Sequence, residues 1–164
     1  MSNLNQGFEV AGGSELLTVA RFSFAADNRV QQRAILEITG LSVECPPANN
    51  NAVLGSAVGG QSKRQATPTR QKFNVLSLKL VATDDTDLFD WYTACNNESG
   101  SQDWQGERQG ASVIAYSQIG DRVAEWQIIN AYPCKYSGPE FAAGDETMAN
   151  EGVDIVYEDF ARIL

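Results

Sequence analysis

The feature that most restricts the fold is an alternation of apolar and polar residues that recurs in six separate segments. In residues 73–82, for example, Leu76, Leu78 and Leu80 alternate with polar residues. Successive side chains of a strand point to opposite faces of a sheet, so this period predicts strands with one buried face. Six such strands are typical of a β-sandwich or a small β-barrel of two packed antiparallel sheets. The predicted strands are residues 19–24, 34–42, 73–82, 111–118, 123–132 and 153–157.

The same alternation predicts which side chains are buried. In residues 34–42, Leu36 and Ile38 share the apolar face, and Gly40 allows a bend or a bulge. In residues 123–132, Trp126 and Ile128 alternate with polar residues and are expected to face the core.

One segment has the period of a helix instead. Leu88, Trp91, Tyr92 and Cys95 are spaced i, i+3, i+4 and i+7, which predicts one α-helix with a single apolar stripe. We expect this helix to cover an edge or an open end of the barrel. The adjacent pair Trp91 and Tyr92 fits a carbohydrate platform as an alternative, but aromatic packing of the helix is the favoured interpretation.

Four acidic residues lie at the start of the predicted helix and raise the question of a metal site. Negative side chains are stabilised there by the helix dipole, which explains the cluster without a cation. The segment also lacks the glycine and the bidentate glutamate of a calcium loop. We therefore expect no metal site at Asp84, Asp85, Asp87 and Asp90.

The composition removes most enzyme classes. The 164 residues fit one domain, 1–164, and contain no histidine, which excludes Ser-His-Asp and Cys-His catalysis and imidazole ligands. Cys45, Cys95 and Cys134 form no CxxC pair and are expected to be buried or half-buried thiols. We assign no catalytic residue, no metal and no cofactor, and we expect a protein that is not an enzyme.

Two further patterns concern location. No stretch approaches about 18 consecutive apolar residues, so we expect no membrane span. The first residues show no charged segment followed by an apolar run, so we expect no secretory signal. We therefore expect folding in a reducing cytoplasm, or export without a cleaved leader.

Charge is unevenly distributed along a chain whose net charge is −9. No acidic residue lies between Cys45 and Thr83, where five of the basic residues lie. A basic segment on an acidic body suggests contact either with nucleic acid or with an acidic copy of the same chain. The net acidity argues against nucleic acid. The five basic residues are Lys63, Arg64, Arg70, Lys72 and Lys79.

Residues 46–72 show no sustained apolar pattern and are rich in glycine, asparagine and proline in their first half. Loops of this length in compact domains are usually functional or disordered. Two interpretations stay open, namely an insertion without consequence and an arm that becomes ordered on a partner.

A motif near the C-terminus supplies the most specific signal. Residues 130–139 read Asn-Ala-Tyr-Pro-Cys-Lys-Tyr-Ser-Gly-Pro, follow a predicted strand, and precede a small-residue turn and a further strand that begins near Glu151. This arrangement resembles the tail tube proteins of contractile phage tails and of phage-like contractile injection systems. Residues 21–24, 36–44 and 73–79 resemble the upstream strands of that family, so the resemblance covers residues 18–157. The motif positions are Asn130, Ala131, Tyr132, Pro133, Lys135, Tyr136, Gly138, Pro139 and Glu151.

The resemblance implies a non-enzymatic subunit that forms hexameric rings, which stack into a hollow conduit for DNA or effector proteins. It also implies sheath subunits, a baseplate and a terminator or cap as partners. We expect assembly in the cytoplasm, as part of a virion tail or an injection particle. Residues 46–72 would then form an arm that reaches the adjacent ring through Lys63, Arg64, Arg70 and Lys72.

The motif also allows local expectations. Proline cannot donate a hydrogen bond to a sheet, so Pro133 and Pro139 are expected to end or interrupt strand pairing. Lys135 and Glu151 are expected to pair with each other, within or between subunits.

Four alternatives remain open. Two lie in the same class, a tube like that of type VI secretion and a baseplate tube-initiator. The others are a monomeric β-barrel that binds a small ligand inside, and a nucleic-acid-binding module that uses the basic loop.

Overall fold

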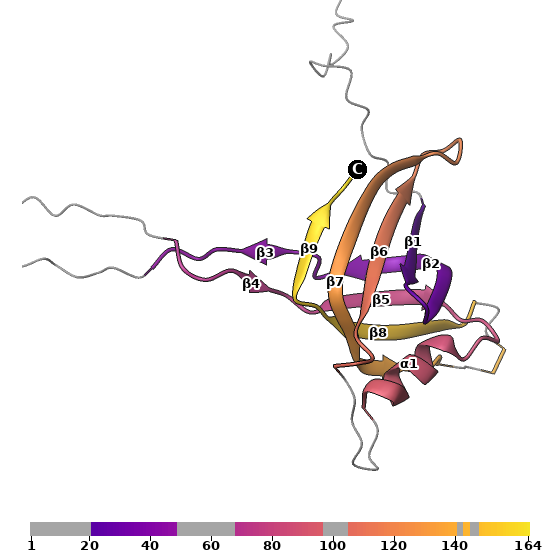
Figure 1. The fold of residues 1–164 in the computed structure, drawn as a ribbon. Coiled ribbons are helices and arrows are strands. Elements are labelled where there is room, and N and C mark those ends of the chain that lie inside the picture. Colours follow the sequence, from indigo (N-terminus) through magenta and orange to yellow (C-terminus); the bar gives the residue numbers. More distant parts are fainter. Residues whose placement is uncertain (1–20, 49–67, 97–104, 141–142, 145–147) are drawn as a thin grey trace, which may run out of the picture.

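The computed structural model describes residues 21–48, 68–96, 105–140, 143–144 and 148–164 (Figure 1). The first two residues of the first predicted strand, and Lys63 and Arg64 of the predicted arm, lie outside the described residues.

Six antiparallel strands close into a barrel in the order β6-β1-β2-β5-β8-β7, because β7 also pairs with β6. A seventh strand, β9, extends the sheet beyond β7. The predicted class, a mainly β barrel with one helix, is confirmed. The strands are β1 (Phe22–Ala26), β2 (Val30–Thr39), β5 (Leu76–Val81), β6 (Gln109–Tyr116), β7 (Arg122–Ser137), β8 (Asn150–Val156) and β9 (Asp159–Arg162).

Strand β7 is the longest element, and it pairs with three other strands (Figure 1). Its first part pairs with β6 on one edge and β9 on the other, and its last part pairs with β8. The strand bends between these parts, where Asn130 has a positive φ of 51°. Pro133 interrupts the register with β8, as expected, but β7 continues to Ser137 rather than ending at residue 132.

The core positions follow the predicted period with one correction. Leu76, Leu78 and Leu80 are at most 3% exposed, and Ile128 is fully buried. Leu36, which was expected to share the core face with Ile38, is instead 49% exposed. A register shift between Ile35 and Glu37 turns the chain by one residue at this point, and such a shift reverses which side chains face the core.

The predicted helix is α1 (Asp87–Cys95), which packs mainly against β7 (Figure 1). Leu88, Trp91 and Cys95 are buried, and the Trp91 indole Nε1 donates a hydrogen bond to the Glu107 carbonyl oxygen at 3.0 Å. Trp91 is therefore a core residue, which rules out a carbohydrate platform at this side chain.

Side chains from the six barrel strands and α1 form one apolar core. This interior packing disfavours the alternative of a barrel that holds a small ligand. The thiols are only partly as predicted, since Cys95 is buried but Cys45 and Cys134 are exposed. None of the helices in the described part of the chain has the length and apolar composition that a membrane-spanning helix requires.

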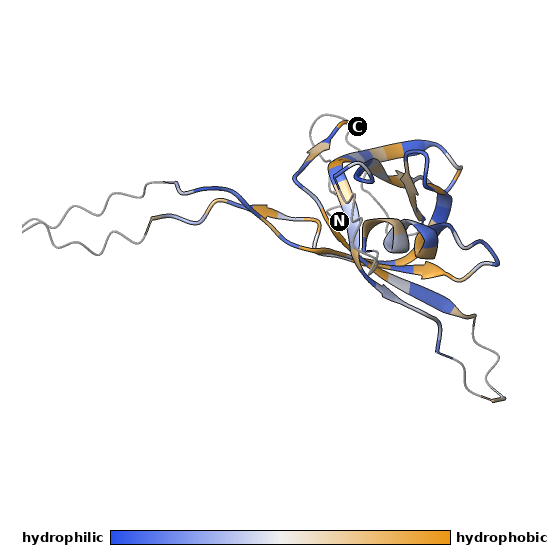
Figure 2. Ribbon diagram, turned by 60° about the horizontal axis from the view of Figure 1, so that its bottom comes forward, coloured by the Kyte–Doolittle hydropathy of each residue, from blue (hydrophilic) through white to orange (hydrophobic). Residues whose placement is uncertain are grey.

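A two-stranded ribbon, made of β3 (Val43–Glu44) and β4 (Lys72–Phe73), leaves the barrel between β2 and β5. A bridge between Pro47 and Pro68 continues the pairing outward. Figures 1 and 2 both show that this ribbon stands clear of the barrel. We call residues 42–48 and 68–74 the ribbon.

Candidate assembly surfaces

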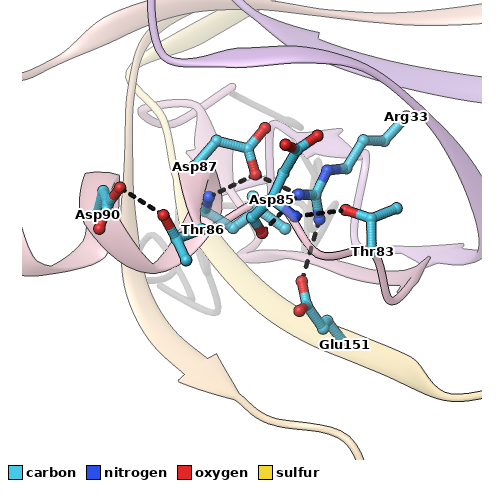
Figure 3. Close-up of polar contacts among 8 residues, drawn as sticks. Arg33, Thr83, Asp85, Thr86, Asp87, Asp90 and Glu151 are labelled. Carbon is cyan, nitrogen blue, oxygen red and sulfur yellow. Dashed lines mark hydrogen bonds and ion pairs between the residues drawn. The ribbon is translucent and has the colours of Figure 1, made fainter.

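Two motif residues, Tyr136 and Glu151, belong to a buried polar network at the end of the barrel beside α1. The Arg33 side chain from β2 is 5% exposed and places Nη1 3.0 Å from Glu151 Oε2. Its Nη2 bonds to the carboxylate of Asp87 and donates to the Asp85 carbonyl oxygen at 3.0 Å (Figure 3). The Arg33 guanidinium therefore joins β2, β8 and the start of α1.

Tyr136 extends this network from β7. Its side chain is hydrogen-bonded to Glu151, and its ring meets Phe89 of α1 edge-on, with ring centroids 5.4 Å apart. Burial raises the pKa of Tyr136, and the negative charge of Glu151 raises it further. The phenol therefore keeps its proton to a higher pH than an ordinary tyrosine does.

The network corrects the expected pair of Lys135 with Glu151 within the subunit. Glu151 is 7% exposed and is bonded to Arg33, whereas Lys135 is exposed and stands opposite Asp154 in the ladder. It also gives Asp87 a role beyond the helix dipole, as a partner of Arg33. Among the described residues, no group of acidic or cysteine side chains is arranged to hold a metal ion.

Asn130 fixes the bend of β7 to the corner between β8 and β9. Its Nδ2 donates to Glu158 Oε2 at 2.7 Å, and Glu158 also forms an ion pair with Arg108. Asparagine tolerates a positive φ better than most residues, which suits this position.

The other motif residues lie along the last part of β7 and just beyond it. Ala131 and Pro133 are buried, and the Pro133 carbonyl oxygen accepts a hydrogen bond from Asn96 Nδ2 at 2.9 Å. Tyr132 and Pro139 are half-buried, and Gly138 is exposed. The motif therefore marks the bend, the helix contact and the end of β7, and it does not form a single binding site.

Of the predicted arm residues, Arg70 and Lys72 are exposed on the ribbon. Lys79 lies on β5 of the barrel, opposite Glu37 of β2. Sequence reasoning missed Arg33, because the second strand was predicted to begin at residue 34. A charged residue on the buried face of that strand was the signal that could have revealed the network.

Strand β9, which sequence reasoning also missed, has one edge that no other strand in the described part of the chain pairs with. Ile163 donates to the Glu125 carbonyl oxygen at 2.9 Å, so this residue turns its backbone groups toward β7. Backbone groups alternate sides along a strand, so those of Phe160 and Arg162 point away from β7. The Phe160 N–H is bonded by its neighbour Asp159, and no described strand pairs with this outer edge.

Comparisons with known structures agree on the fold. A chain of the sheath-tube complex of an extracellular contractile injection system, PVC, in the extended state is 14% identical with a TM-score of 0.68, and the match covers 92% of this chain and 93% of that chain. A chain of the anti-feeding prophage (AFP) baseplate is 14% identical with a TM-score of 0.64, covering 91% and 97%. Hcp1 from Flavobacterium johnsoniae is 15% identical with a TM-score of 0.58, covering 87% and 94%.

A search of curated protein sequences found no match. The family model described as T4-like virus tail tube protein gp19, in contrast, matches residues 18–161, nearly the whole chain. The chain therefore belongs to the T4-like virus tail tube protein gp19 family and is a structural tail tube subunit.

Proposed function

We propose that this subunit forms hexameric rings that stack into a hollow conduit for DNA or effector proteins, and that it performs no catalysis. The observation that carries the proposal is that a closed, well-packed barrel carries two elements for which its described residues provide no partner on the barrel. These are the outer edge of β9 and the part of the ribbon beyond its root, residues 44–48 and 68–72 (Figure 1). Each suits a different direction of assembly.

The edge of β9 supports sideways association. Unpaired strand edges readily accept a strand from another chain, and pairing removes the exposed backbone groups from water. Ile129 beside β9, and Ile163 and Leu164 after it, are 42%, 55% and 52% exposed. Backbone pairing with burial of these side chains is the chemistry of a permanent contact between subunits.

The ribbon supports association between rings. An isolated two-stranded ribbon is only marginally stable in water, so it gains from contact with another surface. Arg70 and Lys72 give it two positive charges against the one negative charge of Glu44, which stands opposite Lys72, while the chain as a whole carries a net charge of −9. A ribbon with a net positive charge and an acidic body are complementary when copies stack.

The similar structures support the choice of partners. Their descriptions include a sheath-tube complex, a tube terminating cap and a baseplate. We therefore assign sheath subunits, a baseplate and a terminator or cap as partners in a phage tail or an extracellular injection particle. A type VI secretion tube is the second candidate. We rank it lower because the TM-score of the Hcp1 match, 0.58, is below the 0.68 of the PVC match.

Replacement of residues 49–67 by a short Gly-Ser turn tests the axial role of the arm. The barrel lies outside this segment, so the variant is expected to fold with an unchanged melting temperature and to form rings. It is expected not to form long tubes in electron micrographs. Tubes of normal length from this variant would refute the role of the arm.

A further inference from the structure

The ribbon is fastened to the barrel by Tyr157, which lies at the corner between β8 and β9. Tyr157 is 4% exposed, and its single O–H is shared between the carbonyl oxygens of Gly40 and Ser42, at 3.1 and 3.3 Å from the hydroxyl oxygen. Both acceptors lie where the chain leaves β2 for the ribbon. A buried tyrosine normally finds a partner for its hydroxyl, and here the partners are the backbone of the ribbon root.

Three aromatic rings surround this root. Phe73 of β4 meets Tyr157 with centroids 5.8 Å apart and Phe160 of β9 with centroids 6.3 Å apart. Tyr157 and Phe160 are themselves 5.9 Å apart, and all three pairs are edge-on. Edge-on pairs of this kind add specific attraction to the area they bury, so they favour one arrangement of the three elements.

The two strands of the ribbon are also locked to each other at the root. Asn74 Nδ2 donates to Ser42 Oγ at 2.7 Å, and the Asn74 N–H approaches the Ser42 carbonyl oxygen at 3.4 Å. Gly40 has a φ of +86°, and a Cβ there would lie 1.9 Å from the Val75 carbonyl oxygen. The backbone at Gly40 packs directly on the backbone at Val75, and this close contact restricts movement of the ribbon root.

We propose that Phe73, Tyr157 and Phe160 fix the direction of the ribbon relative to the barrel before the ribbon contacts another copy of the chain. We call these three residues the mount. The ribbon root is then a preformed docking element, and binding does not have to supply the free energy for ordering it. The residues of the mount all lie outside residues 46–72, so whether that segment becomes ordered on a partner stays open. The inference rests on the proposed function, because it assumes that the ribbon contacts the adjacent ring.

The mount also links the two assembly elements. Phe160 belongs to β9, whose outer edge pairs with no described strand, and Phe73 belongs to the ribbon. Pairing of β9 with a strand of a neighbouring subunit would therefore also stabilise the position of Phe160 in the mount, and with it the direction of the ribbon. Positioning, rather than direct contact with the partner, is the role assigned to Tyr157.

The direction of the ribbon can be measured in unstacked subunits by pulsed electron paramagnetic resonance. Cys45 lies exposed on the ribbon, and Gln127→Cys provides an exposed second site on β7, in a Cys134→Ser background. Labelled chains are diluted with unlabelled chains so that only distances within one subunit are seen. A narrow distance distribution is expected for the parent protein, and a clearly broader one for Phe73→Ala.

Phe89→Ala is the matched control, because Phe89 also forms an edge-on ring pair, with Tyr136, but belongs to α1 and not to the ribbon root. It is expected to leave the distance distribution unchanged. Tyr157→Phe keeps all three rings and removes only the hydroxyl, so it covers the case in which Phe73→Ala fails to fold. Phe73→Tyr keeps the ring and is expected to restore the narrow distribution.

Tube growth supplies the second readout. Phe73→Ala is expected to raise the critical concentration for elongation about tenfold, because the loosened ribbon must be ordered on each contact. The proposal is overturned if Phe73→Ala and Tyr157→Phe both keep the narrow distribution, or if elongation is unchanged when the distribution broadens. Normal tubes without residues 49–67 would instead refute the proposed role of the arm, while the distance distribution would still decide whether the mount exists.

Discussion

The guanidinium of Arg33 on β2 lies 3.0 Å from the carboxylate of Glu151 on β8, and the two strands are separated in the sheet by β5 alone. Both side chains are almost excluded from water, at 5% and 9% exposed. Asp87 brings the start of α1 to the same guanidinium. Charged groups therefore position the helix at this end of the barrel.

Arg33→Met is expected to destabilise the protein strongly. It leaves the buried carboxylate of Glu151 without its cation, and such a change typically costs about 3–5 kcal/mol. Arg122→Met is the matched control, because Arg122 is 56% exposed in its pair with Glu125, and an exposed pair contributes at most about 1 kcal/mol. Urea denaturation at one fixed protein concentration compares them, and equal losses would contradict the role of the network.

Gly40→Ala is expected to be more disruptive than Gly120→Ala. Both glycines have a positive φ, of 86° and 97°, where a side chain costs roughly 1–2 kcal/mol. Only at Gly40 would the new Cβ also meet a backbone atom, the Val75 carbonyl oxygen at 1.9 Å, whereas nothing lies within 4 Å at Gly120. The difference in melting temperature measures the clash, and similar values for both variants would show that the root can adjust.

The core and the helix could be predicted from sequence because they depend on local period. Leu76, Leu78 and Leu80 lie on a strand without a bulge, so the alternation of side chains predicts correctly that all three face the core. Leu36 could not be placed in this way, because the bulge beside it is set by the pairing with β5. The place of Arg33 on a buried face indicates that it needs a partner, but Glu151 is 118 positions away, and no local pattern says which residue that partner is.

The motif residues were found without their roles, for a similar reason. Asn130 and Tyr136 act through partners on other elements, Glu158 at the β8–β9 corner and Glu151 on β8. Strand β9 was missed because four residues are too few to show a period. The roles of Lys63, Arg64, Arg70 and Lys72 in contacts between rings stay predictions.

Stability is expected to fall at alkaline pH through two tyrosines. Burial raises the pKa of Tyr136 and of Tyr157 above the ordinary value of about 10. The folded protein then holds these protons more tightly than the unfolded chain, so the stabilisation is complete below about pH 10 and is lost as the pH rises through the raised pKa values. The melting temperature of the protein, measured at several values from about pH 8 to about pH 11.5, tests this expectation.

Tyr136→Phe provides the comparison, because it removes one titrating group and keeps the ring that packs on Phe89. Its melting temperature is expected to fall less steeply above about pH 10 than that of the parent protein. Parallel curves for the two proteins would show that Tyr136 does not titrate in this way.

Reversal of charge on the ribbon is expected to weaken stacking in a salt-dependent way. Arg70→Glu with Lys72→Glu replaces two exposed positive charges, and salt screens exposed charges over about 10 Å at 0.1 M. Sedimentation should therefore show a larger loss of tubes at low salt than at high salt. A loss that is the same at both salt concentrations would point to packing rather than charge as the cause.

Electron microscopy of the purified protein over a range of concentrations tests the central claim most directly, since that claim is assembly of one chain into a conduit. The expected images show six-fold rings, stacked into hollow tubes as the concentration rises. Isolated monomers at every concentration would contradict the account.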